Sequence, residues 1–236
     1  MEHYKDKIAI VTGGASGIGR ALCEELGRRG AQVVVADINM EGAERTASTI
    51  TAAGGRVRAV HVDVTKAEDV RRLIQETASA HGRLDFMFNN AGIVTVGEVR
   101  DMDLGHWHRI LDINLMGVIY GTTAAYALMI KQGFGHIVNT ASAAGLGPFP
   151  LLASYVMTKH AVVGLSTTLR LEGAGLGVKV SVVCPGFVRT EIFNTPMVNA
   201  PREEVVSKIP PRMIFSVTKA AQELSLIHIS EPTRPY

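Results

Sequence analysis

The chain has 236 residues, of which 47% are hydrophobic, and its 24 basic and 22 acidic side chains give a formal net charge of +2. This length and apolar content suit one folded domain with a sizeable core and exclude global disorder. The near balance of charge excludes the strongly basic surface of a nucleic-acid-binding protein, and no basic run marks a membrane-surface helix.

Short β-branched runs alternate along the chain with longer helical patterns. Because the strands are hydrophobic throughout rather than alternating, both faces of their sheet must be covered, which is typical of parallel strands. The pattern predicts a single-domain α/β protein with a doubly wound parallel sheet, a Rossmann fold with helices on both faces. Strands are expected over 8–11, 33–35, 57–62, 84–88, 136–138 and 178–183, and helices over about 17–29, 41–53, 67–81, 104–132, 154–173 and 217–224.

The stretch 187–215 interrupts this alternation with four prolines and several large apolar residues. A long irregular insertion in a compact domain is usually a lid, a binding loop or disordered, and the apolar content favours a lid. We assign 1–226 to one catalytic domain and 227–236 to an atypical tail. Residues 1–7 are polar and lack the apolar region of a signal peptide, and no uninterrupted apolar span long enough to cross a bilayer is expected.

We expect neither a disulfide between the two cysteines nor a metal site at the pair of histidines. Cys23 and Cys184 lie in apolar stretches, where buried free thiols are expected rather than a disulfide. His106 and His108 diverge on a helix at their spacing of two residues and have no acidic or cysteine cluster beside them, so no metal site is expected. We expect a cytoplasmic protein without nucleic-acid or membrane partners.

A glycine-rich turn joins the first strand to the first helix at Thr12-Gly13-Gly14-Ala15-Ser16-Gly17-Ile18-Gly19. Glycines there let the backbone turn sharply and approach a pyrophosphate, whose charge the helix N-terminus favours. The spacing differs from the common G-x-G-x-x-G pattern, so a tight turn without a ligand is the alternative interpretation.

An acidic residue, Asp37, ends the second strand, where dinucleotide folds place a ribose-binding carboxylate. A carboxylate accepts hydrogen bonds from both ribose hydroxyls and repels a 2′-phosphate. Ser16 and Ile38, near where NADP-binding proteins often carry a cation, are neutral. NAD is therefore favoured over NADP, although Asp37 as the N-cap of the next helix is an alternative.

Polar residues also follow the third and fourth strands, at the same carboxyl edge of the sheet. Asp63-Val64 comes after one and Asn89-Asn90-Ala91-Gly92 after the other. Ligands bind at this edge in open α/β sheets. The two asparagines either form a simple turn or join neighbouring strand ends to a cofactor.

A phenol and an ammonium share one helix face, because Tyr155 and Lys159 are four residues apart. A nearby ammonium favours the phenolate and would lower the pKa of the tyrosine toward working pH, which makes it a usable acid or base. Ser142 follows the fifth strand and can donate to the same substrate oxygen. Asn114 lies among apolar neighbours on a helix and needs partners, such as a water held toward Lys159.

The order of these motifs resembles the short-chain dehydrogenase/reductase family in its short, single-domain, NAD-preferring form, over about residues 5 to 225. The matches are T-G-x-x-x-G-x-G at Thr12 to Gly19, N-N-A-G at Asn89 to Gly92, Y-x-x-x-K at Tyr155, and P-G-x-x-x-T at Pro185 to Thr190. The resemblance implies that Tyr155 is the general acid/base, Ser142 orients the substrate oxygen, Lys159 binds the nicotinamide ribose and lowers the Tyr155 pKa, and Asn114 supports a proton relay. It also implies a homodimer or homotetramer, often packed through the two long helices.

The expected site residues fall into three groups. Catalytic residues are Asn114, Ser142, Tyr155 and Lys159. Cofactor-binding residues are Gly13, Ser16, Gly17, Ile18, Gly19, Asp37, Ile38, Asp63, Val64, Asn90, Ala91, Gly92, Tyr155, Lys159, Pro185, Gly186, Val188 and Thr190. Substrate-binding residues are Ser142, Ala144, Phe149, Leu152, Tyr155, Phe187 and Phe193.

The expected function is therefore hydride transfer between NAD(H) and a secondary alcohol or ketone with a hydrophobic portion. The alternatives are a non-catalytic dinucleotide-binding protein, a truncated inactive dehydrogenase, or an epimerase or dehydratase, for which the chain leaves little room. The ending from Ser225 to Tyr236 departs from the family pattern and resembles adapter-derived read-through joined to a truncated gene.

Overall fold

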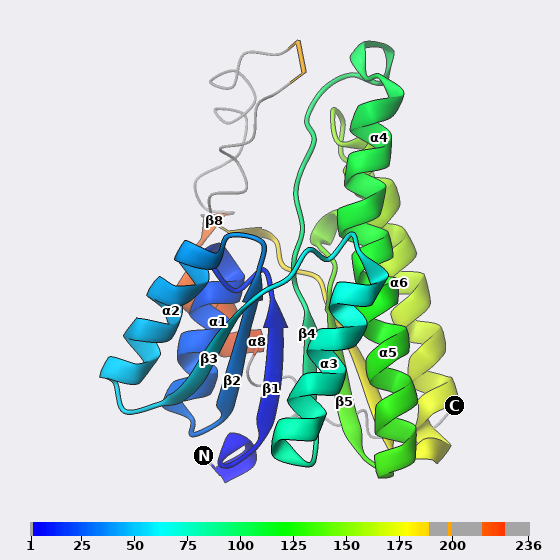
Figure 1. Ribbon diagram of the computed structural model, residues 1–236. Helices are drawn as coiled ribbons and strands as arrows, with labels where there is room; N and C mark the ends of the chain where they lie inside the picture. Colours follow the sequence, from blue (N-terminus) through cyan, green and yellow to red (C-terminus); the bar gives the residue numbers. More distant parts are fainter. Residues whose placement is uncertain (1, 189–197, 200–213, 225–236) are drawn as a thin grey trace.

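A six-stranded parallel sheet with the strand order β3-β2-β1-β4-β5-β6 forms the centre of the computed structural model (Figure 1). The structure describes residues 2–188, 198–199 and 214–224. The order reverses between β1 and β4, which creates the switch point where ligands bind in such sheets. The strands are β1 (Ile8–Thr12), β2 (Gln32–Asp37), β3 (Arg56–His61), β4 (Phe86–Asn89), β5 (Gly135–Thr140) and β6 (Val178–Val183).

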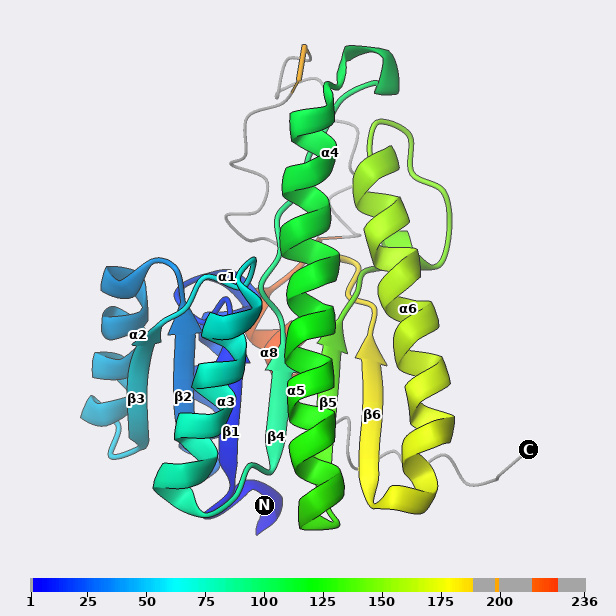
Figure 2. The same ribbon diagram turned by 45° about the vertical axis from the view of Figure 1, so that its right-hand side comes forward.

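Helices cover both faces of this sheet (Figures 1 and 2). Alternate residues of each strand point to opposite faces, so Ala9 and Val11 pack into one core with α1 and α2, while Ile8 and Ile10 pack into the other with α3 and α5. This two-sided burial is why the strands are hydrophobic throughout, and it confirms the doubly wound α/β prediction. The first face carries α1 (Gly17–Arg28), α2 (Met40–Ala52) and α8 (Val217–Leu224), and the second carries α3 (Ala67–His81), α5 (Gly117–Gln132) and α6 (Ala153–Gly173).

Shorter helices and strands lie between the main elements. Helix α4 (Leu104–Leu111) leads into α5 through a π-helical turn at Asp112–Met116. Single 3₁₀ turns lie at Glu2–Tyr4, Val99–Asp101, Ala143–Gly145 and Ala174–Leu176, and two short parallel strands, β7 (Phe187–Val188) and β8 (Ile214–Phe215), pair beside the main sheet. Most of the lid expected over 187–215, including Thr190 and Phe193, lies outside the described residues, as does the tail 227–236.

The helical run Leu104–Gln132 has the expected bounds, but it departs from the expectation that no segment is long and apolar enough to cross a bilayer. By length and composition it is sufficient to cross a membrane, with a mean hydropathy of 1.5 over 18 residues. Ala125 and Met129 of this run are fully buried in the core that covers one face of the sheet. Packing against the sheet therefore accounts for part of its apolar character, since 39% of this window is buried.

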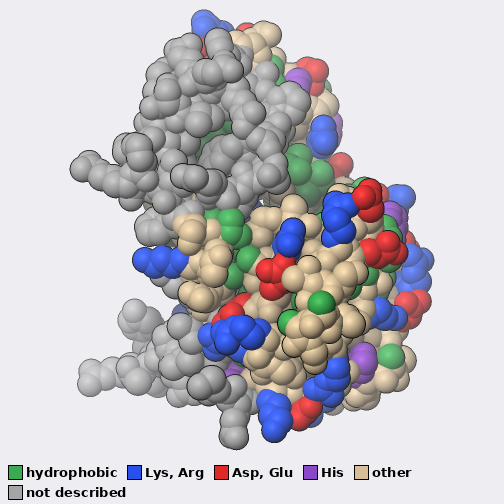
Figure 3. Space-filling model, turned by 90° about the vertical axis from the view of Figure 1, so that its left-hand side faces the viewer, with side chains coloured by type: hydrophobic (Ala, Val, Ile, Leu, Met, Phe, Trp, Pro, Cys, Tyr) green, Lys and Arg blue, Asp and Glu red, His purple; other side chains and the backbone are tan. Residues whose placement is uncertain are grey.

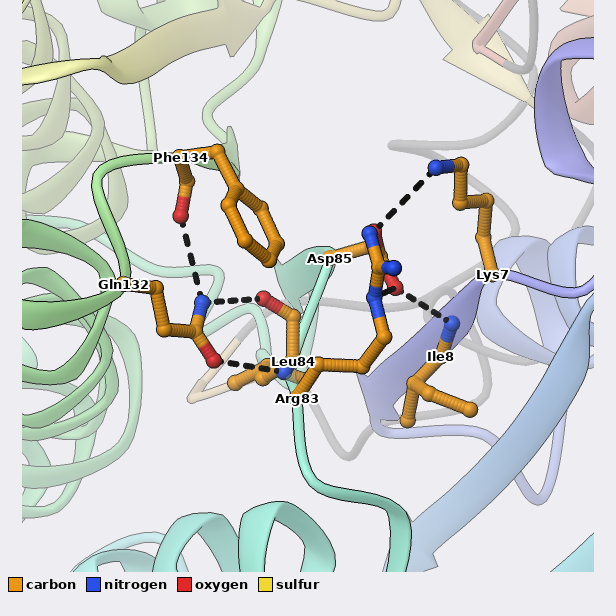
Figure 4. A network of polar contacts seen from close by, with 7 residues as sticks. All are labelled: Lys7, Ile8, Arg83, Leu84, Asp85, Gln132 and Phe134. Carbon is orange, nitrogen blue, oxygen red and sulfur yellow. Dashed lines mark hydrogen bonds and ion pairs between the residues drawn. The ribbon is translucent and has the colours of Figure 1, made fainter.

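A buried carboxylate joins β1 and β4 at the amino edge of the sheet (Figure 4). Asp85 is 6% exposed, accepts a 2.9 Å hydrogen bond from the Ile8 amide, and pairs with Lys7 and Arg83. The Gln132 side chain bonds both backbone groups of Leu84 beside it. These contacts fix the strands at the edge opposite the candidate site.

Acidic and basic side chains are interspersed on the face that Figure 3 shows, around α1 and α2. Several are paired within their helices, as in Arg20–Glu24 and Arg45–Glu41. Such alternation produces no extended field of one sign on this face.

Candidate active site

A cavity of about 650 Å³ opens at the carboxyl edge of the sheet, over the switch point between β1 and β4. Most of the residues expected at the site line it together. They are Gly13, Ser16, Gly17, Ile18, Gly19, Asp37, Ile38, Asp63, Val64, Asn90, Ala91, Gly92, Ser142, Ala144, Phe149, Leu152, Tyr155, Lys159, Pro185, Gly186 and Val188. Asn114 is fully buried behind them; Thr190, Phe193 and the side chain of Phe187 are not among the described parts of the chain.

The glycine turn between β1 and α1 leaves backbone exposed to this cavity. Gly13 and Gly17 have positive φ angles of 68° and 51°, which favour glycine. A Cβ on Gly19 would lie 2.0 Å from the Gly13 carbonyl oxygen, so no side chain fits there. Ser16 is the N-cap of α1 but its side chain makes no capping bond. The first amides of the helix therefore face the cavity, an arrangement that suits a pyrophosphate.

Asp37 ends β2 beside the glycine turn. Its carboxylate accepts 2.9 Å hydrogen bonds from the amides of Ala15 and Asn39. Asn39, not Asp37, is the N-cap of α2, because its side chain accepts from the Gly42 amide. The Asp37 carboxylate is thus held at the cavity wall and does not cap α2.

The two asparagines after β4 have different partners. The Asn90 amide donates to the Thr12 hydroxyl at 3.0 Å, and its side chain donates to the Thr12 carbonyl at 3.1 Å, which ties β4 to β1 below the cavity. Asn89 turns inward and donates to the side chains of Asn139 and Thr122. Only Asn90 lines the site, and Asn89 belongs to a buried polar network beneath it.

Ser142 and Tyr155 line the other end of the cavity, and the Ser142 hydroxyl lies near enough to the Tyr155 hydroxyl to favour its phenolate form. Ser142 follows β5 and its hydroxyl also accepts from the Ala144 amide at 3.2 Å. Tyr155 lies in the first turn of α6. Both hydroxyls therefore lie at one point on the cavity wall, in a position to contact one substrate oxygen.

Lys159 lies one turn further along α6 and is 3% exposed. Its ammonium donates to the Thr140 carbonyl at 2.9 Å and lies 5.5 Å from the centre of the Tyr155 ring. Burial lowers the pKa of Lys159 from 10.5 to about 8.

The pKa of Tyr155 shifts opposite to our expectation. Burial raises it, and the nearby Ser142 hydroxyl offsets only part of this rise. The expectation that Lys159 lowers this pKa is wrong for this geometry, because desolvation of the phenolate dominates and the ammonium is directed to Thr140.

Asn114 occupies the π-helical turn between α4 and α5. Its side-chain oxygen accepts from the Ile93 amide and its nitrogen donates to the Ile93 carbonyl, both at 2.8 Å. A Cβ on Gly92 would lie 3.4 Å from the Asn114 oxygen and 3.6 Å from the Lys159 nitrogen. The amide and the ammonium therefore flank the same glycine, and the π turn that carries Asn114 is of a kind often found at functional sites.

Apolar residues after β4 and β5 form the wall beyond the two hydroxyls. Phe149 and Leu152 line the cavity, and between them Leu151 has a positive φ of 67°. The Leu151 carbonyl accepts from the Gly97 amide at 2.9 Å, and the neighbouring Val96 carbonyl accepts from Val198 at 2.8 Å. The segment 96–97 thus holds two chain segments together beside the wall.

Several lining residues were not anticipated from the sequence. Thr140 could have been found from its place at the end of β5, and Ile93 and Val94 from the motif that precedes them. Arg109 and Ile113 share a spacing of four with Gly117 on the long helix, but only the packing of that helix shows which face meets the cavity. The unanticipated lining residues are Val62, Thr65, Ile93, Val94, Arg109, Ile113, Thr140, Ala141 and Ala143.

The fold and this site together define a dinucleotide-binding oxidoreductase of the α/β class, and comparison with known proteins is specific about the family. Residues 7–198 match the family model for short chain dehydrogenases. The chain belongs to the short-chain dehydrogenase/reductase family of oxidoreductases.

Similar proteins cover most of the chain. It is 36% identical to the cyclohexanol dehydrogenase of Acinetobacter sp. (strain SE19) over 80% of this chain and 76% of that protein. It is 40% identical to the 2,5-dichloro-2,5-cyclohexadiene-1,4-diol dehydrogenase of Sphingobium indicum over 92% of this chain and 86% of that protein. A short-chain dehydrogenase/reductase from Burkholderia phymatum, solved in complex with NAD, superposes with a TM-score of 0.87 at 31% identity and covers 97% of this chain and 88% of its own.

Proposed function

We propose that the protein transfers a hydride between NAD(H) and the carbon of a secondary alcohol or ketone, with a hydrophobic substrate. The observation that carries this proposal is that Ser142 and Tyr155 lie together on the wall of the cavity, with Lys159 buried one helical turn away. The bound nicotinamide would supply or accept the hydride.

The four polar residues at this end of the cavity have different proposed roles. In ketone reduction the Tyr155 hydroxyl donates its proton to the substrate oxygen, and the Ser142 hydroxyl donates a hydrogen bond to the same oxygen. The raised pKa of Tyr155 keeps the phenol protonated at neutral pH, which suits this proton donor. Alcohol oxidation needs the phenolate, so we expect its rate to rise with pH. Lys159 would hold the nicotinamide ribose, and Asn114 would support the relay that returns the proton to Tyr155.

The residues that line the cavity suit the parts of a dinucleotide. The uncapped amides of α1 suit the pyrophosphate, and the glycines exclude side chains that would occupy its place. The Asp37 carboxylate suits the two adenosine ribose hydroxyls, whereas a 2′-phosphate would be repelled. We therefore propose NAD rather than NADP as the cofactor.

The apolar wall of Phe149 and Leu152 supports a substrate with a hydrophobic portion. The names of the two similar dehydrogenases refer to cyclic alcohols, which agrees with such a wall. We propose a cyclic secondary alcohol or the matching ketone as the substrate class.

A homo-oligomer is also proposed, formed through α5 and α6. These long helices lie at one flank of the molecule (Figure 2). Exposed hydrophobic side chains on them include Ile130 on α5, and Met157 and Leu171 on α6, the last 75% exposed. We propose that these side chains are buried against a second copy of the chain. Light scattering on the purified protein would test this, and a monomer at micromolar concentration would contradict it.

The test of the proposed activity follows the absorbance of the reduced cofactor. NADH and NADPH are supplied separately with cyclic ketones, and NAD and NADP with the corresponding alcohols. We expect turnover with cyclohexanone, a clear preference for NADH, and near-complete loss of turnover in Tyr155→Phe with NADH binding retained.

A second tyrosine provides the matched control. Tyr126 lies on α5 beside Gly173, away from the cavity, so Tyr126→Phe should keep wild-type turnover. Turnover in Tyr155→Phe equal to that of the control would contradict the catalytic assignment. Equal use of NADPH would contradict the argument from Asp37.

A further inference from the structure

A tight turn with a strained backbone lies between β5 and α6, at the wall of the cavity. The Leu152 amide donates to the Phe149 carbonyl at 3.2 Å, which closes a four-residue turn. The ring of Pro150 fixes its φ near about −65°, and Leu151 has a φ of 67°. These signs are those of a type II turn, whose third residue needs a positive φ and is normally glycine or asparagine.

Leucine is an unusual residue for this backbone conformation. In the described part of the chain, three residues other than glycine have a positive φ: Asp6, Leu151 and Asn199. Aspartate and asparagine tolerate the left-handed region because their short polar side chains bond locally, whereas a leucine Cβ crowds the following carbonyl oxygen. Such strain persists only where the surrounding contacts enforce it, and it is found most often at binding and active sites.

Contacts on both sides of the turn enforce the conformation of Leu151. Its carbonyl accepts a 2.9 Å hydrogen bond from the amide of Gly97, which is buried. Leu152 is the N-cap of α6, and its carbonyl accepts the first helical bond, from the Val156 amide at 2.8 Å. The turn is therefore held between the segment after β4 and the start of α6.

The two ends of this turn form the apolar wall of the cavity. Phe149 and Leu152 both line the cavity, whereas Leu151 between them is not among its lining residues. A turn brings its first and last residues within about 7 Å of each other. The backbone of Leu151 therefore decides whether the two apolar side chains stay next to each other.

We propose that Leu151 is a positioning residue for substrate binding, whose left-handed backbone holds Phe149 and Leu152 together as one surface for the ring of a cyclic alcohol or ketone. The inference rests on the proposed activity and adds the residue that shapes its substrate wall. A turn that adopts this conformation for only a fraction of the time binds the substrate more weakly by the same factor.

The test changes the backbone preference and the side chain of residue 151 separately. Leu151→Ile keeps the atoms of the side chain but moves the branch to Cβ, which disfavours a positive φ, and it should raise the KM for cyclohexanone about fivefold. Leu151→Gly removes the side chain, adopts the turn without strain and should keep the wild-type KM. The kcat and the Kd of NADH should not change, because neither Tyr155 nor the glycine turn after β1 belongs to this turn.

Leu146 provides the matched control. It is 67% exposed, is not among the residues that line the cavity, and has a φ of −118°, which a β-branched residue can adopt. Leu146→Ile should therefore leave the KM unchanged. A merely structural role of Leu151 would reduce the amount of active protein, and with it the apparent kcat, without opposite responses of the KM in the two Leu151 variants.

The other outcomes overturn the proposal. A raised KM in Leu151→Gly, with or without a change in Leu151→Ile, would show that the side chain is needed, and a wild-type KM in both would remove Leu151 from substrate binding; the proposed activity survives either result. If Leu151→Ile does not fold, Leu151→Gly decides: a raised KM overturns the proposal, and a wild-type KM with a urea midpoint no lower than that of the wild type supports it. A wild-type protein that turns over no cyclic ketone would contradict the proposed function itself, and this inference with it.

Discussion

Replacing the buried lysine by an isosteric apolar residue should stabilise the protein while it abolishes turnover. Folding lowers the pKa of Lys159 from 10.5 to about 8, and at roughly 1.4 kcal/mol per pKa unit this corresponds to a cost of about 3 kcal/mol for keeping it charged at pH 7. The residue is 3% exposed, so solvent screening removes little of this cost. Losing the Thr140 hydrogen bond and the contact with the Tyr155 ring offsets about 1–2 kcal/mol. Lys159→Met should therefore gain about 1–2 kcal/mol of unfolding free energy.

The stability gained by Lys159→Met should depend on pH. Because the folded pKa lies below the unfolded one, the cost is complete below about pH 8, decreases as the pH rises from 8 to 10.5, and is absent above that range. At pH 9.5 about 2 kcal/mol of the cost has disappeared, so the advantage of the variant should vanish.

Urea titrations of both proteins at pH 7 and pH 9.5 measure this directly. Lys131→Met is the control, since Lys131 is exposed near the end of α5, and its effect should be the same at both pH values. If Lys159→Met is less stable than the wild type at pH 7, or if its effect does not change with pH, the reasoning from burial is refuted.

Three further substitutions test the frame around the site. Asp85→Ala should lower the free energy of unfolding by about 2 kcal/mol, because the Ile8 amide and two cations lose their acceptor. Glu98→Gln, at an exposed ion pair, should lower it by less than about 0.5 kcal/mol in the same urea titration. Equal losses in the two variants would argue against a stabilising role of the Asp85 network. Gly97→Ala should raise the KM for the alcohol and leave the Kd of NADH unchanged, because the added Cβ would lie 2.9 Å from the Val198 side chain. Gly147→Ala is the control and should change neither constant, because the space around its added Cβ is open. Gly19→Ala should abolish NADH binding, since the added Cβ would lie 2.0 Å from the Gly13 carbonyl oxygen, and calorimetry showing wild-type affinity would disprove the close approach of the backbone.

The sheet could be predicted because each strand is recognisable from its own run of apolar residues. The run at 33–35 is apolar on both faces, and a strand of that kind requires covering layers whatever the rest of the chain does. The glycine turn, Asp37 and the asparagines could be placed at one edge because parallel strands all end there.

Features that depend on distant contacts could not be predicted. The helix over 104–132 looks continuous in its hydrophobic period, yet it contains a π turn where Asn114 bonds the backbone of Ile93. The direction of the Tyr155 pKa depends on how completely α6 is buried and on where the Lys159 ammonium is directed, neither of which a spacing of four residues determines. Arg109 was missed for the same reason, because only the packing of its helix shows which face meets the cavity.

Single-turnover ketone reduction in Ser142→Ala, Tyr155→Phe and the double variant tests most directly whether the two hydroxyls act on one substrate oxygen. If they work as a unit, the double variant should be scarcely slower than Tyr155→Phe alone, since either change already disables the shared contact. A double variant slowed by the product of the two single effects would show that the hydroxyls act independently, which would contradict their proposed action on one substrate oxygen.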